Sequence, residues 1–353
     1  MLQFNKIAMF YIHQSACISP QQTFGVPLFN ELVAYENNQL HAIEPKYEGI
    51  PPAQIRRMGQ ALRMGVGSGL SLLKNNIVDG IIIGTANGGI EDSISFLNQI
   101  EEYEEGRLTP THFVQSTFNA IAGMLGLIMK NKGYNATHVH RGLAFENTVL
   151  DAYMLLQENA DTQYLIGAVD EISVRNYHME SIAGWYKKEL IKSSELLEHI
   201  STGMLPGEGA AMFLVNNKKQ NAAAKLLAVA QFHSTNSNET FQTLKSFLEQ
   251  YKIELDSIDL FVSGNNADAR FQECYLTIEN EFASKPIVHF KKMFGDFQTV
   301  SALALWLSVQ LFHTNKIPDF MLSNNANSSE TKRILIYNNY RGEQHSFYVL
   351  ERV

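Results

Sequence analysis

Cysteine is scarce in this sequence, with only Cys17 and Cys274 among 353 residues. Two cysteines cannot build a disulfide framework, and neither belongs to a Cys/His cluster with zinc-binding spacing, so we expect no metal site. No apolar run approaches the roughly eighteen residues that a membrane span requires. The apolar run at the N-terminus follows no basic segment and does not resemble a signal peptide. We therefore expect a cytoplasmic protein without a membrane span.

Basic residues are also fewer than acidic residues in this sequence. The sequence has 28 Lys and Arg residues against 36 Asp and Glu residues, a formal net charge of −8. A nucleic-acid partner needs a basic face, so this balance argues against one.

The glycine-rich stretch Gly65–Gly69 lies inside a helical pattern and does not follow a strand, so it lacks the context of a dinucleotide site. We expect no cofactor, and predict that these small residues allow helices to pack closely.

The sequence does contain short, continuous apolar runs that alternate with helical patterns. Such runs are typical of strands that helices cover on both faces, and this alternation favours an α/β sheet with right-handed crossovers. The predicted strands are 80–84, 164–169, 210–215 and 260–263, and the predicted helices are 55–73, 116–129, 145–157, 240–251 and 298–312.

A weak internal repeat indicates duplication. Residues 79–84 (DGIIIG) resemble residues 259–264 (DLFVSG), 180 positions further along the chain. Residues 117–122 (TFNAIA) resemble residues 296–301 (DFQTVS) at an offset of 179. We therefore predict two similar α/β halves, residues 1–215 and 216–353.

Four segments carry a resemblance to a known family. They are 84–89 (GTANGG), 167–171 (GAVDE), 201–211 (STGMLPGEGAA) and 291–295 (KKMFG). They are similar to the GTG-x-GG, AGG-x-E, DG-x-x-x-GEGA-x and K-x-x-x-G segments of the β-ketoacyl synthases. The resemblance implies a thiolase-like fold with five layers, α/β/α/β/α, built from two duplicated halves.

The resemblance also implies where the catalytic residues should lie. The family places a cysteine at a helix N-terminus, where the helix dipole lowers the pKa of the thiol, and uses two histidines to stabilise oxyanions. The cysteine position falls on Gly142 or Leu143, and the histidine positions fall on Gly264 and Asp296. Lys291 retains the family's lysine. The chain thus resembles a degenerate member without the Cys-His-His residues, and we expect both of its cysteines to be ordinary buried thiols.

Other residues near the cysteine position have two interpretations. His138, His140 and Glu146 could supply an imidazole–carboxylate general base. More simply, His138 and His140 share one face of a strand and lie near a subunit interface. Met124 is predicted to lie in the core or beside an acyl tunnel, and Glu208 is predicted to fix a turn.

The function that the resemblance implies is that of a chain-length factor. Such a subunit pairs with an active ketosynthase in type II fatty-acid, polyketide or aryl-polyene-like biosynthesis, and shapes the tunnel for the growing chain. The expected partners are a ketosynthase paralogue, or a second copy of this chain, and an acyl carrier protein. Two alternatives stay open. One is an acyltransferase or hydrolase that uses His138, His140, Glu146 or Asp296, and the other is a homodimeric module that binds acyl groups or carrier proteins.

Overall fold

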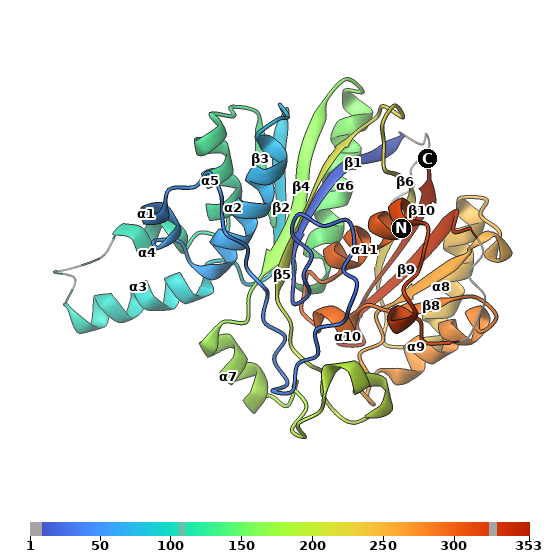
Figure 1. The fold of residues 1–353 in the computed structure, drawn as a ribbon. Coiled ribbons are helices and arrows are strands. Elements are labelled where there is room, and N and C mark those ends of the chain that lie inside the picture. Colours follow the sequence, from blue (N-terminus) through green and yellow to red (C-terminus); the bar gives the residue numbers. More distant parts are fainter. Residues whose placement is uncertain (1–8, 105, 107, 109, 325–329) are drawn as a thin grey trace.

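The computed structural model describes residues 9–353, except for residues 105, 107, 109 and 325–329. Ten strands form one mixed sheet in the order β3-β2-β4-β5-β1-β6-β10-β9-β7-β8 (Figure 1). The strands are β1 (Phe10–Ile18), β2 (Gly80–Thr85), β3 (Tyr134–Val139), β4 (Gln163–Asp170), β5 (Gly209–Asn216), β6 (Ala224–His233), β7 (Leu260–Ser263), β8 (Ile287–His289), β9 (Arg333–Tyr340) and β10 (Gln344–Arg352).

Helices cover this sheet on both faces. They are α1 (Pro52–Ile55), α2 (Gln60–Leu73), α3 (Ile90–Glu102), α4 (Pro110–Gln115), α5 (Ala120–Met129), α6 (Ala144–Glu158), α7 (Val174–Ile182), α8 (Ser237–Gln250), α9 (Gln272–Glu279), α10 (Lys291–Phe294) and α11 (Ser301–Thr314). None of the helices in the described residues combines the length and the apolarity that crossing a bilayer takes.

The strand order is the same in the two halves of the sheet. The first five strands run β3-β2-β4-β5-β1, and the last five run β8-β7-β9-β10-β6. Each half has two parallel and two antiparallel pairings, at the same places. The halves join through a short antiparallel pairing of Phe10–Ile12 with residues 224–226. The division at residues 215 and 216, beside the end of β5, remains a prediction.

Three apolar clusters separate the layers. The largest lies between the two halves of the sheet and includes Phe145 of α6 and Trp306 of α11. A second packs α2 and α5 against the first half, and a third packs α8 and α9 against the second half. The structure therefore confirms the predicted α/β fold with five layers, α/β/α/β/α, in which α6 and α11 form the central layer (Figure 1).

One of the two predicted repeat pairs has a clear structural basis. Asp79 precedes β2, and its Oδ2 accepts a hydrogen bond of 2.8 Å from the Gln163 N–H at the start of β4. Asp259 precedes β7, and its Oδ2 accepts a hydrogen bond of 2.9 Å from the Arg333 N–H at the start of β9. In both halves the acid therefore fixes the start of the neighbouring parallel strand.

The second repeat pair is wrong. Residues 117–122 lead into α5, which precedes β3, whereas residues 296–301 lead into α11, which follows β8. The topological counterpart of α11 is α6. An aromatic residue before an apolar helix start is too common a pattern to identify equivalent elements.

The prediction for the glycine-rich stretch in α2 is confirmed. A Cβ atom on Gly65 would lie 2.8 Å from the Ile121 side chain, and one on Gly69 would lie 2.8 Å from the Leu125 side chain. Both neighbours belong to α5. The missing side chains let α2 and α5 approach closely, and no nucleotide is needed to explain them.

Candidate functional site

The cysteine position lies in the 3₁₀ turn η1 (Arg141–Leu143), directly before α6. Gly142 is buried there under Tyr340, and a Cβ atom on Gly142 would lie only 2.3 Å from the Tyr340 Cβ atom. The Gly142 N–H donates a hydrogen bond of 2.9 Å to Oε1 of Gln344. The position thus has neither room for an acyl thioester nor a free backbone donor for an oxyanion.

Tyr340 is itself held from several sides. Its hydroxyl accepts a hydrogen bond of 3.2 Å from Gln298 Nε2, and burial raises the pKa of Tyr340 to about 12. The next residue, Arg341, has a left-handed backbone (φ 57°) and places its guanidinium 4.0 Å from the ring centroid of Trp185. Arg341 also pairs with Glu180 in the helix α7. We call Tyr340 and Arg341 the plug.

The two histidine positions are equally closed. A Cβ atom on Gly264 would lie 2.9 Å from Phe290 and 3.0 Å from Oδ1 of Asn338. Asp296 lies with its Oδ1 3.0 Å from Nζ of Lys291, and both side chains are almost fully buried. The Asp296 Oδ2 accepts a second, 2.6 Å hydrogen bond from the side-chain amide of Asn266.

The Lys291 side chain also belongs to this hydrogen-bond network. Its ammonium donates a hydrogen bond of 2.9 Å to the Asn339 carbonyl as well as pairing with Asp296. Burial lowers the pKa of Lys291, although the carboxylate of Asp296 opposes this shift. Three consecutive residues at the end of β9, Asn338 to Tyr340, therefore contact Gly264, Lys291 and Gly142. The structure therefore brings the predicted catalytic positions together around this strand end.

The histidines near the cysteine position have other partners than Glu146. His138 Nε2 lies 2.8 Å from Oδ2 of Asp151, and the His140 ring faces the ring of His233 at 6.1 Å. Glu146 is fully buried, and its Oε1 accepts a 2.8 Å hydrogen bond from Ser346. Burial raises the pKa of Glu146 and so favours its neutral form. Among the described contacts, no imidazole pairs with Glu146 as a general base would require.

The remaining predicted residues lie outside this site. Met124 is half-buried on α5 and packs against the cluster beneath α2. Glu208 is fully buried and accepts 2.8 Å hydrogen bonds from the N–H groups of Ala42 and Ile172. Its role is structural, as predicted, but these bonds connect distant segments and do not fix its own turn. Both cysteines are buried, as predicted, and burial raises the pKa of Cys17 to about 12, so its thiol is not activated.

Sequence reasoning missed Asp170, at the end of β4. Its carboxylate accepts hydrogen bonds of 2.9 Å from Thr85 Oγ1, the Asn87 N–H and Thr299 Oγ1. Burial raises the pKa of Asp170 to about 6 in spite of these bonds. The residue ties the glycine-rich turn after β2 to the segment before α11. Its place inside the GAVDE segment was the one signal that could have identified it.

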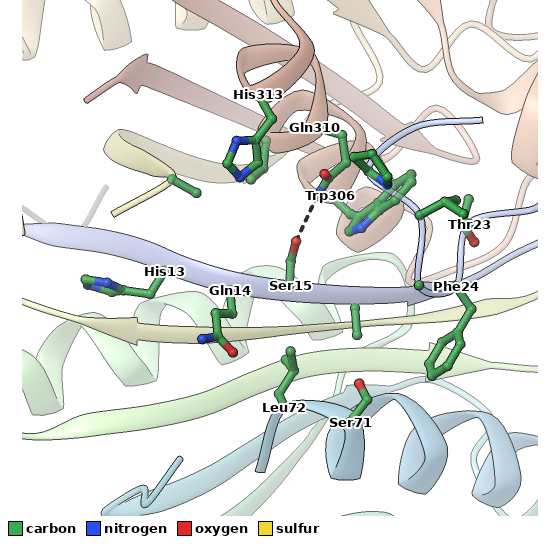
Figure 2. Close-up of a pocket in the computed structure, with 16 residues that line it drawn as sticks. His13, Gln14, Ser15, Thr23, Phe24, Ser71, Leu72, Trp306, Gln310 and His313 are labelled. Carbon is green, nitrogen blue, oxygen red and sulfur yellow. Dashed lines mark hydrogen bonds between the residues drawn. The ribbon is translucent and has the colours of Figure 1, made fainter. Parts of the chain in front are cut away.

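Two cavities in the described part of the chain lie away from these positions. One of about 410 Å³ lies between β1, the loop 23–27 and α11, where Gln310 Nε2 donates a 3.0 Å hydrogen bond to Ser15 Oγ (Figure 2). A neighbouring cavity of about 460 Å³ beside α2 shares Phe24 and Ser71 with it. Neither Gly142 nor Asp296 lines either cavity, so neither of these spaces is an acyl tunnel that opens at the degenerate positions.

Residues 33–255 match the family model of the β-ketoacyl synthase N-terminal domain. This chain belongs to the β-ketoacyl synthase family. No curated protein matches its sequence.

Solved structures of β-ketoacyl synthases share the fold over nearly the whole chain. A β-ketoacyl synthase from Burkholderia phymatum STM815 has a TM-score of 0.78 and 14% identity, and covers 98% of this chain and 100% of its own. The ishigamide ketosynthase/chain length factor has a TM-score of 0.78 and 13% identity, with coverages of 99% and 100%. A ketosynthase in complex with its chain length factor from Xenorhabdus doucetiae has a TM-score of 0.77 and 12% identity, with both chains fully covered. At sequence identities of 12–14%, these comparisons show that the chain shares the fold of these proteins and nothing more.

Proposed function

We propose that this chain is a non-catalytic β-ketoacyl synthase-like subunit of the chain-length-factor type. It pairs with an active ketosynthase in a type II pathway that makes fatty acids, polyketides or aryl polyenes. The observation that carries the proposal is the end of β9, whose side chains and carbonyl fill the space around Gly142, Gly264 and Lys291.

The chemistry of condensation supports this proposal. The reaction needs a thiolate to hold the acyl chain and donors aimed at two developing oxyanions. Gly142 offers no thiol, and its N–H is already bonded to Gln344. A carboxylate at residue 296 has the wrong charge to stabilise an oxyanion, and it neutralises the nearest ammonium, that of Lys291.

The edge strand β3 is the proposed pairing surface. Unpaired edge strands offer a row of free N–H and C=O groups to another chain. β3 ends the sheet and has no fully buried residue, while Leu127 of the adjoining α5 is 74% exposed and Val139 is 43% exposed. The opposite edge, β8, is buried and forms a bridge with Leu322.

The proposed partner is a paralogue that retains the Cys-His-His residues, because only such a partner supplies the chemistry that this chain lacks. An acyl carrier protein would deliver the growing chain to that partner. Two of the similar solved structures contain a ketosynthase together with a chain length factor, which supports the pairing. The alternative hydrolase function has less support, since the hydrogen bonds of Glu146 and His138 lead to other residues.

The test is co-expression with a Cys-His-His ketosynthase from the same organism, followed by measurement of the molar mass of the purified species by light scattering. We expect a one-to-one complex. We expect the double variant Leu127→Asp, Val139→Asp to weaken association at least about tenfold, because two carboxylates would be buried in an apolar contact.

Leu276→Asp is the matched control. Leu276 is 44% exposed on α9, on the outer face of the other half of the sheet, and should leave the complex intact. A homodimer that ignores the ketosynthase would contradict the heterodimer and favour the homodimeric binding module. Condensation of acyl and malonyl thioesters by the isolated chain would contradict its non-catalytic status.

A further inference from the structure

A second group of polar side chains lies at the β8 edge of the sheet. Glu279 ends α9, His289 ends β8, and Ser323 follows the 3₁₀ turn η5 (Asp319–Met321). His289 Nε2 lies 2.9 Å from Oε1 of Glu279, and its Nδ1 is hydrogen-bonded to Oγ of Ser323. The three side chains thus form a continuous acid–imidazole–hydroxyl chain, built from three separate elements.

The acid in this chain is held in its ionised form. Glu279 Oε1 also accepts hydrogen bonds of 2.6 Å from Ser263 Oγ and 3.2 Å from Asn265 Nδ2. Burial alone would raise the pKa of Glu279, but the hydrogen bond and the charge of His289, together with the hydrogen bonds from Ser263 and Asn265, leave it below its ordinary value.

An ionised Glu279 selects the tautomer of His289. A carboxylate only accepts hydrogen bonds, so the nearest imidazole nitrogen, Nε2, must carry the proton. When the imidazole is neutral, the other nitrogen, Nδ1, presents a lone pair to Ser323 and can accept its hydroxyl proton. An imidazole between an acid and a hydroxyl is the arrangement that activates a serine, here with the roles of the two ring nitrogens exchanged relative to the Ser-His-Asp triad.

A serine nucleophile must be exposed while its base and acid are buried, and the three residues differ in exposure in this way. His289 is 5% exposed and the Glu279 side chain is 11% exposed, whereas Ser323 is exposed to solvent. The Ser323 N–H donates a 3.0 Å hydrogen bond to the Ile287 carbonyl, which fixes the serine beside β8. The serine therefore lies at the surface, while the base and its orienting acid are shielded from water.

We infer that Ser323 is a nucleophile that accepts the acyl group of an activated ester or thioester. The Ser323 Oγ atom attacks the carbonyl carbon and passes its proton to His289 Nδ1. The tetrahedral intermediate then expels the alkoxide or thiolate, which takes that proton, and leaves an acyl ester on Ser323. Water, deprotonated by the same nitrogen, hydrolyses this ester and restores the serine.

The proposed non-catalytic status refers to condensation, and this reaction is separate from it. The reaction is also independent of the proposed pairing with a ketosynthase. It uses none of the degenerate positions Gly142, Gly264 and Asp296, and it needs no partner chain. An inactive Ser323 would leave the chain-length-factor proposal intact, and failure to pair would leave this inference intact.

The test treats the full chain with a fluorophosphonate probe and, separately, with p-nitrophenyl acetate, and locates the adduct by peptide mass spectrometry. We expect a single adduct on Ser323 that is absent from Ser323→Ala. His289→Gln should slow labelling about 100-fold or more, the usual contribution of a positioned general base. Glu279→Gln should slow it as well, because a neutral amide no longer dictates the imidazole tautomer.

Ser257→Ala, which alters a serine that is bonded to the carbonyl of Glu254, is the matched control and should label at the rate of the unaltered chain. Circular dichroism of each variant separates loss of reactivity from loss of folding. No adduct on the unaltered chain, an adduct that persists in Ser323→Ala, or an unchanged labelling rate in folded His289→Gln and Glu279→Gln would each overturn the inference.

Discussion

At residue 142 the absence of a side chain is a packing requirement imposed by Tyr340. Atoms of the Tyr340 side chain lie 2.3, 2.6 and 2.9 Å from the place where a Cβ atom of residue 142 would stand. A cysteine at residue 142 would therefore require the end of β9 to move. The lack of a side chain at residue 142 and the position of the plug are coupled through this direct contact.

This contact predicts a stability effect. Gly142→Ala should lower the free energy of unfolding by about 1–3 kcal/mol, because the added methyl group overpacks the site. Tyr340→Gly removes the colliding atoms, so the double variant should lose clearly less than the sum of the two single changes. Gly123→Ala is the control, since a Cβ atom there has its nearest neighbour at 3.7 Å. Chemical denaturation measures all four variants, and strict additivity would contradict the proposed collision.

His345 predicts a dependence of stability on pH. It is fully buried, donates from Nε2 to the Ser234 carbonyl at 2.8 Å and lies 3.0 Å from the Tyr337 hydroxyl. Burial lowers the pKa of His345 from 6.5 to about 4. Between these values the unfolded chain binds a proton that the folded chain does not, so the contribution of His345 to stability falls as the pH falls from 6.5 to 4.

The size of this loss is roughly 3 kcal/mol, since each pKa unit corresponds to about 1.4 kcal/mol. His345→Gln removes the titrating group and should flatten the slope of unfolding free energy against pH in this window. Urea titrations at about pH 4.5, 5.5 and 6.5 measure the slope. The exposed His313→Gln should leave the slope unchanged, and an equal slope in His345→Gln would contradict the assignment.

At the scale of elements, the two aspartates before β2 and β7 make the duplication testable. Asp79→Ala leaves the Gln163 N–H without its acceptor, and Asp259→Ala does the same to the N–H groups of Lys332 and Arg333. Each change should cost about 1–3 kcal/mol of unfolding free energy, and the double variant should show the sum, because the sites share no partner. Asp161→Ala, at an exposed turn, is the control. A cost at one site alone would mean that the two acids are not equivalent.

The elements that the sequence predicted best are the most deeply buried ones. All four predicted strands coincide with β2, β4, β5 and β7, and every residue of β2, β5 and β7 is buried. A continuous apolar run is sufficient evidence for such strands. The predicted helix 55–73 instead breaks into α1 and α2, with Gly59 as the N-cap residue of α2. The strand β8, with three residues, and the surface helix α7, which buries no residue, have too little apolar pattern to be recognised.

The sequence predicted the positions of the site residues but not the contacts between them. The motifs located Gly142, Gly264 and Asp296, and the structure brings these positions together. The side chain that covers Gly142 comes from residue 340, almost two hundred positions away, and no local pattern connects the two. The same limit applies to Ser323 and His289, because a contact between distant segments exists only after the sheet has formed.

At the scale of the whole molecule, the central layer belongs to both halves. Its cluster combines Phe145 and Val149 from α6 with Leu303 and Trp306 from α11. A half that folded alone would expose one face of its central helix to water, at a cost of roughly 25 cal/mol for each Å² of apolar surface. We therefore do not expect the predicted boundary at residues 215 and 216 to separate two folding units.

The two tryptophans of the chain can test this expectation, because Trp185 lies before the boundary and Trp306 lies after it. Trp306→Phe leaves a reporter at the plug, and Trp185→Phe leaves one in the central layer. In each variant we expect the fluorescence transition in urea to coincide with the loss of helical circular dichroism, as a two-state transition requires. Each variant is compared only with itself, so the cavity created by Trp306→Phe does not affect the conclusion. If the Trp185 signal and the circular dichroism separate, the halves unfold one after the other, and the half that unfolds last is stable without the other.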